Sequence, residues 1–198
     1  MSDAVTIIDQ APLQDRDLLQ RLSVYFDGFH TRLRQGQGWF IFNAPGGRAN
    51  RITSFIQYRL SDYRPAVSAC FIPWRDFAIN AYIKEIGLSE LSPEIESSMP
   101  DPRVKQEYEI AVQITRKTLN EMSFSDVLVL SGLKPSHEHE AIFLDQMLEE
   151  RYRQKLATIL LTPDMPQELE AEFESLDPSH AVWERLFQRM YETSLVAL

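Results

Sequence analysis

The residues best placed to do chemistry lie between positions 38 and 50, where a short apolar segment is followed by a glycine-containing turn and a helix-forming stretch. This part of the chain reads Gly-Trp-Phe-Ile-Phe-Asn-Ala-Pro-Gly-Gly-Arg-Ala-Asn. A strand, a glycine-rich turn and a helix in this order are typical of a phosphate-binding loop, in which backbone N–H groups cradle phosphate oxygens. A lysine in such loops contacts the outer phosphates and a hydroxyl holds magnesium, so the chemistry to expect is nucleotide binding or hydrolysis.

The side chains that perform this chemistry are missing. The pattern of glycine, four residues and Gly-Lys-Ser/Thr aligns best with Asn43 at the first glycine and Arg48, Ala49 and Asn50 at the last three positions. This alignment keeps Ile52 on the apolar face of the following helix, whereas a shift by one residue moves that face out of phase. Ala49 cannot contact a phosphate through its side chain, and Asn50 is a poor replacement for a hydroxyl. The candidate nucleotide-binding residues of this degenerate loop are Asn43, Pro45, Gly46, Gly47, Arg48, Ala49 and Asn50.

Two interpretations of the loop stay open. Arg48 or Arg51 could place a guanidinium near a phosphate, and the backbone N–H groups at the start of the helix could attract an anion. Alternatively, the Pro-Gly-Gly sequence at 45–47 is only a turn between a strand and a helix.

The elements around the loop alternate between strands and helices, which predicts an α/β protein of three layers with a parallel sheet covered on both faces. Strands are predicted at 39–42, 66–72, 126–130 and 157–162, with a final apolar segment at 194–198. Helices are predicted at 13–35, from the loop to residue 60, and at 74–86, 103–122, from 137 onward, 166–173 and 179–192, with a surface loop at 88–102. Ligands of such sheets bind beyond the carboxyl ends of the strands, where the turns at 45–47, 131–132 and 162–163 should meet.

Composition and charge argue against several kinds of site and several classes of protein. The net charge of −9 disfavours broad binding to nucleic acid. The lone cysteine, Cys70, excludes an internal disulfide and a multi-cysteine metal site, and no other metal site is predicted. No apolar stretch is long enough to span a membrane and no secretory signal is present, so we expect a cytoplasmic protein. The small basic clusters at Arg32 and Arg34 and at 151–155 could contact phosphate, although cations also favour helix C-termini.

The order of these elements resembles the AAA+ core of the bacterial helicase loaders and insertion-sequence ATP-binding proteins, the DnaC/IstB type. The similarity runs from about residue 20 to the end of the chain, and we expect one AAA+-like P-loop domain over 1–198, with an N-terminal helix in 1–36 leading into it. The stretches that carry the resemblance are Gly38-Trp-Phe-Ile-Phe, Phe71-Ile-Pro-Trp-Arg-Asp-Phe, Ser125-Asp-Val-Leu-Val-Leu, Phe143-Leu-Asp-Gln-Met-Leu-Glu-Glu-Arg-Tyr, Ala157-Thr-Ile-Leu-Leu-Thr and Trp183-Glu-Arg-Leu-Phe-Gln-Arg-Met.

The resemblance implies further functional positions. Where the family has an acidic pair after its third strand, this chain has Ser131 and Gly132, and where the family has a polar sensor it has Pro163. Arg185 and Arg189 match the region of the family's arginines and are candidates for an arginine finger that acts on a neighbouring subunit. The alternative is a solvated helix face whose arginines pair with Glu184 or Glu192.

The altered sites together predict a catalytically inactive AAA+-like protein, a pseudo-ATPase with no catalytic residues and no cofactor, acting through protein–protein contacts. The resemblance implies a partner from DNA replication or transposition, such as an active ATPase. The alternatives are a switch that binds ATP or ADP through the degenerate loop, and a weak ATPase with an unusual set of residues.

Overall fold

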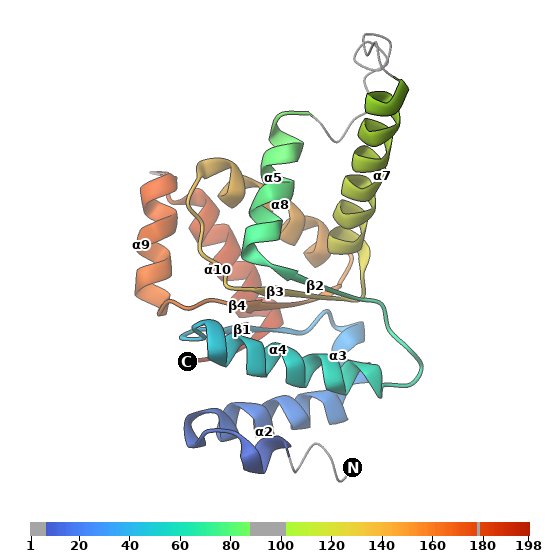
Figure 1. Ribbon diagram of the computed structural model, residues 1–198. Helices are drawn as coiled ribbons and strands as arrows, with labels where there is room; N and C mark the ends of the chain where they lie inside the picture. Colours follow the sequence, from blue (N-terminus) through green and yellow to red (C-terminus); the bar gives the residue numbers. More distant parts are fainter. Residues whose placement is uncertain (1–6, 88–101, 178) are drawn as a thin grey trace.

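The computed structural model describes residues 7–87, 102–177 and 179–198, and it contains a five-stranded parallel sheet with the order β2-β3-β4-β1-β5 (Figure 1). The strands are β1 (Gly38–Ile41), β2 (Ala69–Pro73), β3 (Val127–Ser131), β4 (Ala157–Leu161) and β5 (Ser194–Ala197). The helices are α2 (Leu13–Asp27), α3 (Phe29–Arg34), α4 (Gly46–Ser61), α5 (Trp74–Glu85), α7 (Pro102–Phe124), α8 (Glu138–Arg153), α9 (Pro166–Leu176) and α10 (Ala181–Thr193). The predicted fold class is confirmed, and the final apolar segment is its fifth strand.

One prediction about the helices needs adjustment, and one about a loop stays a prediction. The helix expected over 13–35 is two helices, because the chain leaves helical geometry at Gly28, whose φ and ψ are −100° and 19°. Most of the surface loop predicted at 88–102 lies outside the described residues.

The sheet separates two apolar clusters, and the alternation of side chains along each strand explains why. Trp39 and Ile41 of β1 pack with α2 and α4, whereas Phe40 packs with residues of α8 and α10 on the opposite face. Because successive side chains of a strand point to opposite faces, a strand covered on both sides must be apolar at every position. The central strands β1, β3 and β4 follow this pattern except at Ser131, which ends β3, and at Thr158 of β4, whose hydroxyl accepts a hydrogen bond from Arg151, and Figure 1 shows helices above and below the sheet.

The register of the sheet brings the predicted turns together at its carboxyl edge. Ile41 of β1 and Ser131 of β3 are both aligned with Leu161 of β4. Beyond the strands, the Ala44 N–H donates to the Thr162 carbonyl at 2.8 Å and the Leu133 N–H donates to the Leu161 carbonyl at 2.8 Å. The segments that follow β1, β3 and β4 therefore meet as the sequence predicts.

Arg151 does not belong to a surface cationic patch, because it is 1% exposed. Its guanidinium donates to the carbonyls of Met122 and Ala157 at 2.8 and 2.6 Å and to Thr158 Oγ1 at 2.9 Å. Burial lowers the pKa of this guanidinium to about 10, which leaves it charged at neutral pH. Carbonyls near the C-terminus of α7 carry partial negative charge and stabilise this cation, which fixes α8 against α7 and β4.

None of the helices in the described part of the chain is long and apolar enough to cross a membrane.

The contact between β1 and β4 requires glycine at position 38. A Cβ added there would lie 1.8 Å from the Thr158 carbonyl oxygen, which belongs to the backbone and cannot move aside. We expect Gly38→Ala to lower the free energy of unfolding by about 3 kcal/mol or more, since overpacking here separates two paired strands. Urea denaturation measures the effect. Gly46→Ala is the matched control: no atom lies within 4 Å of the added Cβ, and a helical alanine should raise stability by roughly 0.4–1 kcal/mol. Equal stability of the two variants would contradict the expectation.

Candidate functional site

The turn between β1 and α4 is shorter than a phosphate-binding loop of the predicted alignment. Helix α4 begins at Gly46, the fourth position of the pattern, so that Gly46 and Gly47 belong to its first turn. The N–H groups of Arg48 and Ala49 donate to the Pro45 carbonyl at 2.8 and 3.1 Å. Part of the expected loop is thus helix, and these two N–H groups are used within it.

Other backbone donors of the turn bind the segment that follows β4. The Asn43 N–H donates to the Asp164 carbonyl at 3.0 Å, as the Ala44 N–H does to Thr162. Asn43 itself has a left-handed conformation with a φ of 50°, which asparagine tolerates better than most residues. For the N–H groups of Gly46 and Gly47, the described residues provide no acceptor. These two donors at a helix N-terminus are what the turn can still offer to an anion.

The side chains at the lysine and hydroxyl positions do not converge on a common point. Ala49 is buried and packs in the apolar cluster on the α2 side of the sheet, whereas Asn50 is exposed. A lysine at position 49 would begin inside this cluster. The geometry thus places the residue that matches the catalytic lysine toward the protein interior.

The two arginines beside the turn are held by Asp15 of α2. Arg48 Nε donates to Asp15 Oδ1 at 3.0 Å, and Arg51 donates to Asp15 Oδ2 from Nε at 2.9 Å and from Nη2 at 2.6 Å. Asp15 has no exposed surface, and the Arg48 side chain is 10% exposed. Arg48 also donates to the Asn43 carbonyl at 2.6 Å. One buried carboxylate therefore binds both guanidinium groups that could have reached a phosphate.

Sequence reasoning missed Asp15, although a signal was present. Asp15 lies three and four residues before Leu18 and Leu19, in phase with the buried face of α2. An acidic side chain at a core position of a helix has to find a cation, because an unpaired buried charge is very unfavourable. The candidates at the correct distance along a neighbouring helix were Arg48 and Arg51.

Beside the ends of β3 and β4 lie three charged residues that the sequence analysis did not single out, a lysine and two carboxylates. Ser131 ends β3, and Gly132 follows with a φ of 74°. Lys134 Nζ lies 3.4 Å from Asp164 and 2.9 Å from Glu172. The hydrogen bond to Glu172 raises the pKa of Lys134. This lysine at the carboxyl edge is paired with carboxylates, as Arg48 and Arg51 are.

Pro163 follows Thr162, whose buried hydroxyl accepts the Asp164 N–H at 3.2 Å. A proline side chain has no donor with which to orient a water molecule. The hydroxyl beside it is already engaged by the backbone of the same turn.

Arg185 and Arg189 of α10 form ion pairs across to α8 rather than with Glu184 or Glu192. Arg185 lies 2.8 Å and Arg189 2.5 Å from the Asp145 carboxylate, and Arg189 also pairs with Glu149. Both arginines therefore form ion pairs in this chain, as the alternative interpretation expected, but their partners are Asp145 and Glu149.

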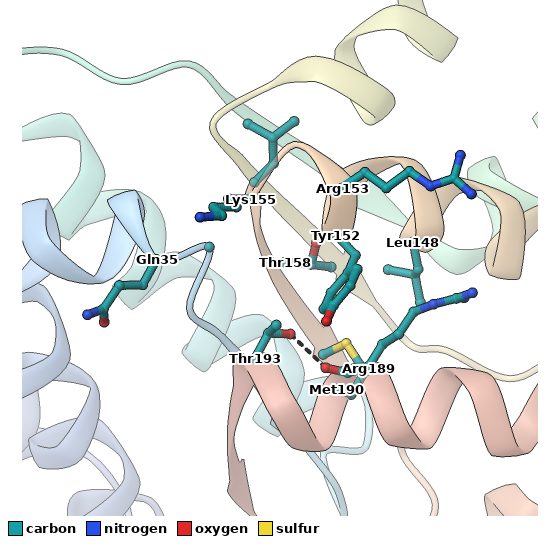
Figure 2. A pocket seen from close by; sticks show the side chains of 11 residues that line it. Gln35, Leu148, Tyr152, Arg153, Lys155, Thr158, Arg189, Met190 and Thr193 are labelled. Atoms are coloured by element: carbon teal, nitrogen blue, oxygen red, sulfur yellow. Dashed lines mark hydrogen bonds between the residues drawn. The ribbon is translucent and has the colours of Figure 1, made fainter.

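Arg189 also lines a cavity of about 330 Å³ (Figure 2). Tyr152 projects across this cavity, and Gly36 and Leu156, which precede β1 and β4, form part of its wall. Because these residues lie at the amino ends of the strands, the cavity and the 43–50 turn occupy opposite edges of the sheet. Arg189 and the turn are not brought together within one chain.

The pairing of Asp15 with the two arginines leads to a first test of the site. Asp15→Ala should lower the free energy of unfolding by about 3 kcal/mol, because it leaves the largely buried Arg48 guanidinium without its carboxylate. The loss at Arg51 adds little, since that side chain is 41% exposed. Asp17→Ala is the control on the same helix: that side chain is 84% exposed, and its loss should change stability by less than about 0.5 kcal/mol. Urea titrations followed by circular dichroism give both values, and a cost below 1 kcal/mol for Asp15→Ala would show that the buried pair contributes little.

No protein-family model matches the chain, and no curated protein matches it in sequence. Solved structures do match it in fold. The DnaC helicase loader superposes with a TM-score of 0.60 over 95% of this chain and 92% of the loader chain, at 15% identity. A DNA replication initiation factor gives a TM-score of 0.59 over 96% of this chain and 48% of its own, at 13% identity. The AMPPCP-bound DnaA from Aquifex aeolicus gives a TM-score of 0.52 over 88% and 45%, also at 13% identity.

The chain spans about half the length of the initiation factor and of DnaA, and nearly all of the DnaC loader. The parallel sheet, its strand order and these superpositions agree with the fold implied by the sequence resemblance. The chain has a three-layer α/β fold with a parallel sheet, which it shares with the DnaC helicase loader and with DnaA.

Proposed function

We propose that this chain is a DnaC-like AAA+ replication protein that does not hydrolyse nucleotide and acts through contacts with a protein partner. The observation that carries the proposal is the state of the turn at 43–50: its two nearby arginines are bound to Asp15, and its lysine position is the buried Ala49. The replication role rests on the fold shared with the DnaC loader and the initiation factor.

Phosphoryl transfer depends on charges that are positioned before the reaction begins. The predicted alignment supplies no lysine for the outer phosphates and no hydroxyl for magnesium. After β3 it supplies Ser131 and Gly132 where an acidic pair would organise the metal and the attacking water. Each loss alone could be compensated, but all of them together remove the groups by which this fold stabilises the transition state.

Contacts with a partner are supported by aromatic side chains on the outer face of α10. Phe187 and Tyr191 are four residues apart with ring centroids 6.3 Å from one another, and Phe187 lies 5.5 Å from Trp183, which is buried in the core behind them. Phe187 is 43% and Tyr191 71% exposed. Exposed aromatic residues in a row are typical of protein interfaces, where large rigid rings supply contact area. The partner we propose is a component of replication or transposition, such as an active ATPase.

A second candidate function is a switch that binds ATP or ADP without turnover. It is favoured by the N–H groups of Gly46 and Gly47, which have no acceptor in the described residues, and by the nucleotide analogue bound to the related DnaA fold. A weak ATPase that uses Arg48 would additionally require Arg48 to leave Asp15.

Incubation with radiolabelled ATP and magnesium separates these functions. The isolated chain should release no phosphate above a control without protein, and the same result should hold with candidate partners unless the partner itself is the ATPase. Titration calorimetry with ATP and ADP should show no binding at submillimolar concentration. Submillimolar affinity without turnover would support the switch instead, and robust turnover by the isolated chain would contradict both proposals.

Restoring the motif in sequence gives a sharper test of the geometry. The double variant Ala49→Lys and Asn50→Thr supplies the missing lysine and hydroxyl, yet we expect it to remain inactive. The side chain of the introduced lysine would start from a position inside an apolar cluster. Gly46 and Gly47 belong to the first turn of α4 and so do not form the loop that would surround a phosphate. Burial of an ammonium group should also lower stability by several kcal/mol. Asn50→Thr alone is the control, because that side chain is exposed. Recovery of ATP turnover in the double variant would show that the loop had lost its side chains but kept its shape.

A further inference from the structure

A second cavity, of about 440 Å³, lies beside the edge strand β5 and shares no lining residue with the 43–50 turn. We call it the β5 groove. It is bordered by α2, the middle of α3 and the strands β1 and β5, and the residues that line it are Asp17, Gln20, Arg21, Val24, Arg32, Trp39 and Leu195.

In the described part of the chain, β5 has no partner strand on the side of this groove, although Arg21 covers part of its edge. β5 ends the sheet order and pairs with β1. The Ala197 carbonyl faces β1, because it accepts the Phe42 N–H at 2.9 Å. The Val196 carbonyl faces away from β1, because it accepts Arg21 Nη2 at 3.1 Å. Since backbone groups alternate in direction along a strand, the Val196 N–H also faces the open edge, where a further strand could pair with it.

The side chains of the β5 groove are rich in hydrogen-bond donors. Trp39 is 1% exposed, and its indole N–H has no acceptor in the part of the chain that the structure describes. Buried donors without acceptors are rare, because each lost hydrogen bond is costly. The Arg21 guanidinium lies 5.4 Å from the centre of the Trp39 ring. The groove thus places a cation directly beside an unsatisfied donor.

The positive charge of the β5 groove is weakly compensated. Arg32 donates to the neutral Gln37 Oε1 at 2.7 Å. The carboxylate of Asp17 lies 3.9 Å from Arg21, and these side chains are 84% and 47% exposed. An exposed pair at this distance contributes little. In a chain with a net charge of −9, this surface therefore favours an anionic ligand.

We propose that the β5 groove binds an extended acidic segment of a partner protein, which adds as a strand beside β5. A carboxylate of this segment is received by Arg21, Arg32 and the Trp39 indole N–H, and its apolar side chains contact Val24 and Leu195. A free small carboxylate would satisfy the arginines but leave the Val196 N–H unpaired. An extended segment satisfies both sets of donors, with backbone pairing giving affinity and the charges giving specificity.

Nuclear magnetic resonance tests this proposal on the full chain. The probe is a short capped peptide of alternating valine and glutamate, with a peptide of alternating valine and lysine for comparison. The chain has three tryptophans, and Trp39→Phe identifies the Trp39 indole signal. We expect the glutamate peptide to shift this signal downfield, to shift the Val196 amide and to slow its exchange, whereas the lysine peptide leaves both unchanged.

Matched variants assign the effect to the groove. Arg21→Gln and Arg32→Gln should each weaken binding about tenfold, the loss expected for one charge-assisted hydrogen bond. Arg34→Gln removes the same charge from α3 at an exposed position outside the lining, and should leave binding unchanged. Circular dichroism checks that all three variants are folded.

Three results would overturn the proposal. One is the absence of any shift with millimolar peptide. The second is a shift of the Trp39 signal by succinate at the same affinity as by the peptide, which would identify a site for small carboxylates. The third is self-association of the chain that Arg32→Gln abolishes, which would place a second copy at β5.

Discussion

The contact on which the rest of this structure depends is the buried ion pair network of Asp15, Arg48 and Arg51. It joins α2 to the first turn of α4 through a carboxylate with no exposed surface. Because α4 begins at the carboxyl edge of the sheet, this one contact fixes the N-terminal helix against the position where a P-loop would bind phosphate. The same charges cannot both hold α2 and remain free for a ligand. The two guanidinium groups can bind either Asp15 or a phosphate, and in this chain both bind Asp15.

The fold could be predicted from the sequence because its signals are local. The apolar runs at 127–130 and 158–161 have no polar face, which only strands covered on both sides can accommodate, and β3 and β4 occupy these positions. The break at Gly28 was missed because apolar spacing continues across it from Phe26 to Phe29. A glycine inside a periodic helix is tolerated often enough that the pattern alone did not indicate two helices.

The site was harder to predict because its contacts are distant in sequence. Which residues stand at the P-loop positions follows from alignment, but the partner of Arg48 lies 33 residues away and that of Arg185 lies 40 residues away. The expected partners Glu184 and Glu192 are neighbours on the same helix, whereas packing of α10 against α8 brings Asp145 between both arginines. Tertiary packing thus decides ion pairing here, since pairs along one exposed helix are weak.

The distribution of charged side chains over the fold supports the proposal of recognition without turnover. At the carboxyl edge, the N–H groups of Asn43 and Ala44 bind the segment after β4, and Lys134 is paired with carboxylates. At the side of the sheet, the β5 groove retains an indole donor without an acceptor and two weakly compensated arginines. An enzyme of this fold needs its free charge at the carboxyl edge, where ligands of parallel sheets bind. This chain keeps such charge beside an edge strand and pairs its cations with carboxylates at the P-loop position, which supports the proposal that the β5 groove binds another chain.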